Sequence, residues 1–395
     1  MRYVRSTMWL AIIGIVSTLA MPLLFPGEAR AIPAFARKYR QSCSTCHVAA
    51  PKLKAYGEEF AGNGFVLPDG EEPKRSTIDT GDEWLLLQSD LPLAIRFDAY
   101  LRAQESADVD TDLETPYGVK LLSGGRITHN VSYYFYFFLY ERGEVAGVED
   151  AYLHFNNIRG SELDILAGQF QVSDPLFKRE LRLTFEDYQM YRFRPGESQA
   201  NLTYDRGLVL TYGFGFGLDA VAQVLNGNGI GAAEEDRVFD VDSEKAAALR
   251  LSQGLGPVRL GAFGYYNEEQ NELAARNELF YAGGDATLGA EKWELNLQYL
   301  RREDSNANFA AQDSTDMKTD GGFAELVVMP RGDRSRWVFV GLYNFIECDD
   351  DAYDTRRATA SANLMAARNL RFLFEYTFDL EREASEFVLG AMGAF

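Results

Sequence analysis

Hydrophobic and polar residues alternate along many segments that follow residue 84. In WELNLQY, residues 293–299, every odd-numbered position is apolar or aromatic and every even-numbered position is polar. Successive side chains of a β-strand point to opposite faces, so this period of two predicts a strand. LRFLFEYTF, residues 370–378, repeats the pattern, with Arg371, Leu373, Glu375 and Thr377 opposite the aromatic positions.

Such segments predict about sixteen strands over residues 84–395. Short turns such as 128–130 and 368–369 alternate with longer loops such as 105–116 and 303–320. This asymmetry is typical of outer-membrane barrels, so we predict a mainly β fold with a transmembrane antiparallel barrel whose termini are periplasmic. A soluble β-sandwich is the alternative, because each barrel strand is a weak signal by itself.

The first 31 residues have the order of a secretory signal peptide. Two arginines precede an apolar run over residues 8–25, and the small-residue site Ala29-Arg30-Ala31 follows. We therefore assign residues 1–31 to a signal peptide and expect an exported chain that begins at Ile32. A membrane anchor is the alternative, since the run approaches the length of a short spanning helix.

The charge balance excludes one class of partner. The chain has 59 acidic and 39 basic residues, for a net charge of −20. Such acidity argues against nucleic acid as a partner. After the signal peptide there is no apolar run long enough to cross a bilayer as a helix, which leaves strands as the expected contact with outer-membrane lipid.

The segment RQSCSTCHVA, residues 40–49, contains the sequence Cys-x-x-Cys-His. Cys43, Cys46 and His47 in this spacing are the attachment signature of a c-type haem. The two cysteines would form thioethers to the porphyrin, and His47 would be an axial ligand of the haem iron. The sequence therefore predicts one covalently bound haem c.

Other uses of the two cysteines fit less well. A zinc site needs about four ligands, and the third cysteine of the chain, Cys348, is far away in sequence without a matching pair. A thioredoxin-like redox motif expects a strand and a helix around it, whereas a proline and a short basic segment precede Cys43. A chance occurrence of the motif is the third alternative.

Residues 32–75 are predicted to form a small helical monohaem module. Leu53, Tyr56 and Phe60 follow helical spacing, and Gly62 and Gly64 are helix stop signals. A module of this size is too small for an independent core, so it needs the haem, the rest of the chain, or both. Residues 76–83 are assigned to a linker. A barrel of about sixteen strands encloses a lumen wide enough for this module to act as a plug.

The segment PAFARKYRQSCSTCH, residues 33–47, resembles the fused cytochrome-porins of the outer membrane, best known from iron-oxidising bacteria. The architecture, a monohaem module followed by a porin-like barrel, resembles them too. This likeness implies electron transfer between an extracellular redox donor or acceptor, Fe(II) being one, and a periplasmic c-type cytochrome or other electron carrier. It implies an electron-transfer protein more than a classical enzyme, with the haem module in the periplasm or the barrel lumen. LDILAGQFQVSDPLF, residues 163–177, is similar to phosphate-type porins.

The second axial ligand of the iron is less well defined by the sequence. His154 shares a polar strand face that is expected to line the lumen, and it is the preferred distal candidate. The alternative is a hydrogen-bonded lumen histidine. Met190 lies in the longest connection, residues 174–205, and is a weaker candidate because long porin loops often fold inward. Basic residues of that connection are expected at a constriction, at the haem propionates, or in salt bridges: Lys178, Arg179, Arg182, Arg192 and Arg194.

Three functions remain open at this point. The first is an electron conduit through one haem c. The second is a haem-plugged solute or anion porin of the phosphate-selective type. The third is a haem-dependent peroxidase or sensor, which requires an open sixth position on the iron.

Overall fold

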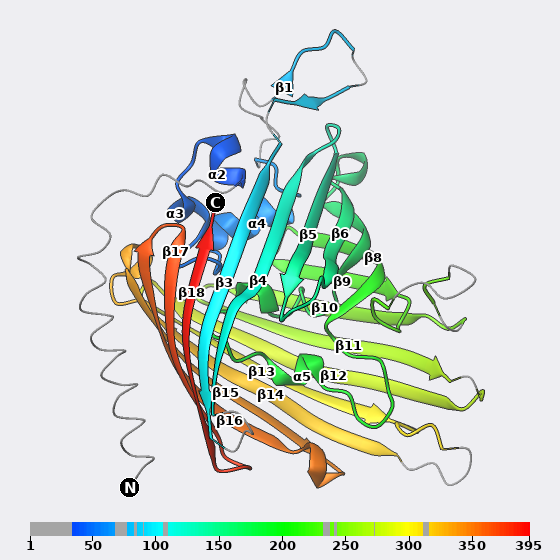
Figure 1. Ribbon diagram of the computed structural model, residues 1–395. Helices are drawn as coiled ribbons and strands as arrows, with labels where there is room; N and C mark the ends of the chain where they lie inside the picture. The colour runs from blue at the N-terminus through cyan, green and yellow to red at the C-terminus, as the bar shows by residue number, and fades with distance from the viewer. Residues whose placement is uncertain are drawn as a thin grey trace, which may run out of the picture.

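The computed structural model describes residues 34–67, 77–82, 85–89, 91–105, 110–231, 238–240, 243–271, 273–310 and 316–395. The predicted signal peptide lies outside these residues. Sixteen strands, β3 to β18, form one closed antiparallel barrel in which β18 pairs with β3 (Figure 1). The predicted mainly β fold and strand number are confirmed.

The barrel strands follow one another around the ring in chain order. They are β3 (Leu93–Gln104), β4 (Thr111–Arg126), β5 (Val131–Glu141), β6 (Gly147–Phe155), β7 (Leu163–Gln171), β8 (Tyr204–Phe214), β9 (Leu218–Leu225), β10 (Ala246–Leu255), β11 (Val258–Gln270), β12 (Arg276–Ala290), β13 (Trp293–Asp304), β14 (Met317–Val328), β15 (Trp337–Cys348), β16 (Thr355–Ala367), β17 (Leu370–Asp379) and β18 (Ala384–Ala394). A two-stranded sheet, β1 (Thr77–Ile78) with β2 (Leu87–Gln88), precedes them.

The polar and apolar faces of the strands point in the directions that the sequence predicts. In β13 the even-numbered Asn296 and Gln298 are buried, while Trp293 and Leu297 are exposed on the outer surface. In β17 the odd-numbered face, from Arg371 to Thr377, is buried. Polar side chains therefore point into the lumen and apolar ones out of the barrel, as in transmembrane barrels.

The connections are short at the end that holds both barrel termini. The predicted turns 128–130 and 368–369 join β4 to β5 and β16 to β17. The loops at the other end are shorter than predicted, because strand pairing continues into them. β4 starts at Thr111, inside the predicted loop 105–116, and β13 and β14 enter the predicted loop 303–320 from both sides.

Three helices, α2 (Ala34–Tyr39), α3 (Cys43–Cys46) and α4 (Ala55–Gly62), form the N-terminal module. Figure 1 shows them at the barrel end that holds the C-terminus. α4 starts later than the predicted helix, because the backbone of Lys54, the residue before it, is extended. Leu53 therefore lies outside the helix and forms a β-bridge with His47. The predicted stop is correct, since α4 ends at Gly62. No helix among the described residues is long and apolar enough to cross a membrane.

The connection between β7 and β8, residues 172–203, folds into the barrel. It contains the 3₁₀ turn η2 (Arg179–Leu181) and the helix α5 (Gln189–Arg192). Its apolar side chains, including Val172, Leu176, Tyr191 and Leu202, are buried in one cluster with lumen-facing residues of the wall. The predicted inward-folded connection is therefore confirmed; this segment is called the lumen loop below. Three further 3₁₀ turns, η1 (Ile158–Gly160), η3 (Gly332–Arg334) and η4 (Asp351–Tyr353), lie in other connections.

Candidate functional site

The Cys-x-x-Cys-His segment forms one turn of helix. Cys43 and Cys46 are the first and last residues of α3, and the backbone N–H of His47 donates to the carbonyl of Cys43 at 2.9 Å. Ser42 caps the turn by accepting from the N–H of Ser44. Cys43 and Cys46 are not joined by a disulfide. One helical turn therefore presents two free thiols and places the imidazole directly after them.

A second hydrogen bond orients the imidazole of His47. Its Nδ1 lies 2.9 Å from the carbonyl oxygen of Pro51. A carbonyl only accepts, so Nδ1 carries the proton and Nε2 keeps its lone pair. Metal-binding histidines are commonly held this way, with the second ring nitrogen donating to a backbone carbonyl. Cys43, Cys46 and His47 therefore fit a c-type haem, whose iron Nε2 of His47 would bind.

The protonation states agree with this fit. Burial lowers the pKa of His47, and backbone contacts with Pro51 and Lys52 only partly offset it, so the imidazole is neutral at pH 7. Neutral imidazole is the form that binds metals. Burial also raises the pKa of the Cys43 and Cys46 thiols, so both are protonated at neutral pH before any attachment.

The module crosses the lumen from wall to wall. On one side Lys52 donates to Glu294 of β13, and Lys54 donates to Asp333 in the β14–β15 turn, both at 2.6 Å. On the other side Phe65 stacks on Tyr134 of β5 with ring centroids 4.7 Å apart. β5 and β13 lie eight strands apart in a ring of sixteen, on opposite sides of the barrel. The module is therefore positioned as a plug at the end with the short turns.

Apolar contacts add to these ties. Val48 and Ala49, directly after His47, are buried in one cluster with Leu183 of the lumen loop and with lumen-facing residues of β14 to β16. Wall residues of the cluster are Val327, Val338, Val340 and Met365. The segment that follows the Cys-x-x-Cys-His turn is therefore sandwiched between the wall and the lumen loop.

His154 lies on the lumen face of β6, as predicted, and is 4% exposed. Its Nε2 is 3.5 Å from Asp164 and has no hydrogen-bond partner. A Cβ added at Gly64 would lie 3.0 Å from Nδ1 of His154, so this histidine contacts the chain just after α4. Cys46 contacts the opposite end of α4, because its carbonyl faces Gly57. The structure brings His154 to the module but leaves the length of α4 between it and the Cys-x-x-Cys-His turn.

Met190 lies elsewhere. It is 1% exposed in the lumen-loop cluster and packs against Gly321 of β14. From Gly321 to Val327, which belongs to the cluster around Ala49, the strand rises roughly 20 Å. The structure therefore does not bring Met190 to the Cys-x-x-Cys-His turn.

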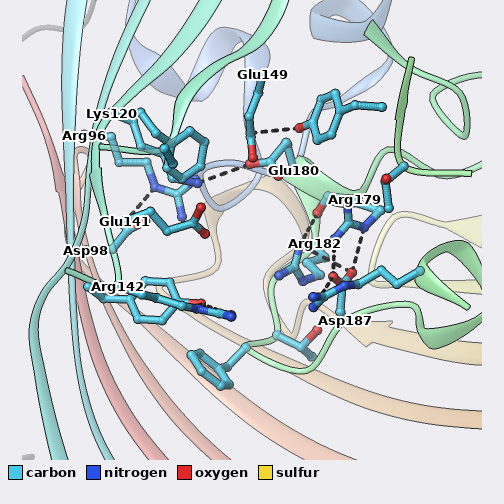
Figure 2. Close-up of a pocket in the computed structure, with 18 of the residues that line it drawn as sticks. Arg96, Asp98, Lys120, Glu141, Arg142, Glu149, Arg179, Glu180, Arg182 and Asp187 are labelled. Atoms are coloured by element: carbon cyan, nitrogen blue, oxygen red, sulfur yellow. Dashed lines mark hydrogen bonds and ion pairs between the residues drawn. The ribbon is translucent and has the colours of Figure 1, made fainter. Parts of the chain in front are cut away.

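A cavity of about 690 Å³ lies between the lumen loop and the wall formed by β3 to β6 and β17. Figure 2 shows Arg96 and Lys120 on the wall facing Arg179 and Arg182 of the loop. Eight basic and six acidic side chains line the cavity: Arg96, Lys120, Arg142, Arg179, Arg182, Arg192, Arg194 and Arg371, with Asp98, Glu141, Glu144, Glu149, Glu180 and Asp187. The cavity is thus slightly basic in a strongly acidic chain.

Asp187 gathers three of the predicted arginines. Arg179 pairs with it directly, and Arg182 and Arg192 approach to 3.6 and 3.7 Å. Lys178 pairs with Asp174 at 2.6 Å instead. The alternative of salt bridges is therefore correct for four of the five residues. Arg179, Arg182, Arg192 and Arg194 line the cavity, and their role at a constriction stays a prediction.

Sequence reasoning missed the wall side of this cavity. Arg96, Lys120 and Arg371 come from three strands and meet only because β17, β18, β3 and β4 are neighbours in the closed ring. The available signal was a basic residue at a polar position of each strand. That signal does not say which strands lie opposite a loop.

No protein-family model and no curated protein matches this chain. Solved structures are similar to the barrel. An anion-selective porin from Comamonas acidovorans matches with TM-score 0.58 and 10% identity over 78% of this chain and 99% of that one. The outer membrane channel DcaP of Acinetobacter baumannii matches with TM-score 0.55 and 12% identity over 78% and 97%. OmpF of Salmonella typhi, in complex with daunomycin, matches with TM-score 0.54 and 12% identity over 77% and 97%.

At these identities the likeness shows the fold. The chain has a porin-like sixteen-strand barrel of the outer-membrane type, and the predicted location in the bacterial outer membrane is confirmed at that level.

Proposed function

We propose that this chain is a porin-type barrel of the outer membrane, plugged from the periplasmic end by a module that carries one covalent haem c. When bound, the haem supplies a one-electron redox centre. We infer that the protein moves electrons between an extracellular donor or acceptor and a periplasmic carrier such as a c-type cytochrome. Fe(II) is one donor that this chemistry accepts.

One observation carries the proposal. The Cys-x-x-Cys-His turn, with Nδ1 of His47 held by Pro51, lies in a module that spans the lumen from Lys52–Glu294 to Phe65–Tyr134. A redox centre in this position would lie within the barrel wall and not below it. Such a centre would shorten the distance that an electron has to cross between the two sides of the membrane.

Sealed liposomes test this proposal. Haem-loaded protein is inserted, a membrane-impermeant donor is added outside, and reduction of an acceptor trapped inside is followed. We expect transfer with the natural chain and none with a Cys43→Ala, Cys46→Ala variant. A reducible haem that passes no electrons would disprove the conduit.

A solute or anion porin plugged by the haem module is the second candidate. The similar structures support it more directly, because they are porins and channels. The charged cavity beside the lumen loop also favours it, since porin pathways are polar. This function predicts anion or solute flux through planar bilayers without electron transfer.

A further inference from the structure

Arg371 is a buried cation that lacks a carboxylate partner. It lies on the lumen face of β17, is 5% exposed and lines the cavity beside the lumen loop. One guanidinium nitrogen, Nη2, contacts the sulfur of Met392, while Nε and Nη1 have no hydrogen-bond partner. Among the ion pairs of the described residues, none includes Arg371.

The neighbouring carboxylates have other partners. Asp98 accepts from Nε of Arg96 at 2.8 Å. Glu375, two positions along β17, accepts from the backbone N–H groups of Phe185 and Glu186 at 2.8 and 2.7 Å. Both carboxylates therefore hold other groups in place, and the free nitrogens of Arg371 remain without an anion.

A buried, unpaired guanidinium is costly, whereas an anion in the adjacent space would supply its missing hydrogen bonds. The planar fork of arginine matches the oxygens of carboxylates and phosphates in a bidentate pair. Arg96 and Arg182 line the same cavity, but Arg96 pairs with Asp98 and Arg182 lies 3.6 Å from Asp187. Of these three cations, Arg371 is the one whose guanidinium has no carboxylate partner.

We propose that this cavity binds a small oxyanion, of the carboxylate or phosphate class, on the guanidinium of Arg371. The anion has two possible sources. It enters the lumen from solution, or it is a carboxylate side chain of the haem itself. The second source is near, because Met365, the cross-strand partner of Arg371, belongs to the cluster that holds Val48 and Ala49. The proposal depends on neither electron transfer nor haem attachment, and it names a ligand class for the second candidate function.

Calorimetric titration with inorganic phosphate tests this proposal. The detergent-purified, haem-loaded full chain is titrated at constant ionic strength in chloride, and the experiment is repeated with the haem-free Cys43→Ala, Cys46→Ala variant. We expect saturable binding that weakens at least about tenfold in Arg371→Gln, because a charge-assisted bidentate contact is lost. Arg194→Gln is the matched control: it removes one positive charge from an exposed position of the same cavity lining, and its affinity should stay within about twofold of the natural chain.

The two protein forms separate the two sources. Binding that depends on Arg371 in both forms identifies an anion from solution. Binding that depends on Arg371 only in the haem-free form identifies the haem carboxylate as the usual occupant. No saturable binding in either form, or an affinity that Arg371→Gln leaves unchanged in both forms, overturns the proposal.

A conservative variant keeps the test decisive should Arg371→Gln not fold. Arg371→Lys retains the charge and much of the packing but loses the fork, so we expect a several-fold weaker affinity. An affinity of Arg371→Lys equal to that of the natural chain also overturns the proposal.

Discussion

Lys52 of the N-terminal module and Glu294 of β13 are joined by a 2.6 Å ion pair across 242 positions of sequence. The second ion pair, Lys54 to Asp333, has the same length. The Asp333 side chain is 61% exposed, whereas that of Glu294 is 29% exposed. Solvent screens an exposed ion pair more strongly, so the Lys54–Asp333 pair should be the weaker of the two.

We therefore predict that Lys52→Gln loosens the plug more than Lys54→Gln. The first change should cost about 1 kcal/mol of docking free energy, and roughly fivefold more module should be undocked. The second should cost less than about 0.5 kcal/mol. The rate of tryptic cleavage within residues 34–67 of the folded barrel measures this, and equal rates for the two variants would contradict it.

Gly64 should not tolerate a side chain. Its φ is +67°, and an added Cβ would overlap the hydroxyl of Ser132 on β5. We predict that Gly64→Ala displaces the module from this wall, at a cost of at least about 1–2 kcal/mol from the backbone alone. Gly62→Ala is the control, because nothing lies within 4 Å of that position. The same cleavage assay should show faster digestion of the first variant and unchanged or slower digestion of the second.

His154 remains the predicted distal ligand: its Nε2, 3.5 Å from Asp164, has no hydrogen-bond partner, although α4 separates it from the Cys-x-x-Cys-His turn. We predict that His154→Ala converts a six-coordinate, low-spin haem into a five-coordinate one. His129→Ala, in the exposed turn after β4, and Met190→Ala, in the lumen-loop cluster, should leave the spectrum unchanged. Visible absorption of the purified proteins decides this, and a low-spin spectrum in His154→Ala removes His154 from the site.

Asp187 holds the lumen loop in place through its ion pairs, and the stabilisation that it supplies should depend on pH. This residue lies in a connection outside the spanning strands. Burial raises the pKa of this carboxyl, but Arg182, Arg179 and Arg192 outweigh burial and hold the pKa well below the usual range. A carboxylate with a depressed pKa stabilises the folded state above its unfolded pKa, near 4, and the stabilisation is lost as the pH falls further.

We predict that the contribution of Asp187 to anchoring is constant from pH 8 to about pH 5 and weakens below about pH 4. Asp187→Asn should show the weakened state already at pH 7. Amide hydrogen exchange of residues 183–193, corrected for its intrinsic pH dependence, measures both effects. Glu197→Gln changes an exposed carboxylate of the same loop that makes no ion pair among the described residues, and it should behave like the natural chain.

Local periodicity explains which parts of this fold the sequence predicts. Period-two alternation in residues 293–299 and 370–378 is a property of each strand alone, so the strand faces and the barrel class are predictable. Loop lengths are less predictable from the sequence. β13 and β14 stay paired as far as Asp304 and Met317, which is beyond the point where the alternation fades.

The candidate sites also differ in how far the sequence predicts them, depending on whether their residues are close together along the chain. Cys43, Cys46 and His47 are close in sequence, so their spacing alone predicts the haem site, whose occupancy stays a prediction. Met190 was chosen because long loops fold inward, which is correct, but the packing of α5 on Gly321 takes it to the wall. Arg371 could not be singled out, since its lack of a partner depends on the positions of Asp98, Glu375 and the lumen loop together.

The closed ring of strands also constrains the order of biogenesis. With β18 paired to β3 there is no open sheet edge, so the module reaches the lumen through the barrel mouth or is enclosed while the ring closes. Once docked, Cys43 and Cys46 are half-buried in a turn held between the two walls. An enzyme that attached a porphyrin to these two thiols would therefore have to act before docking.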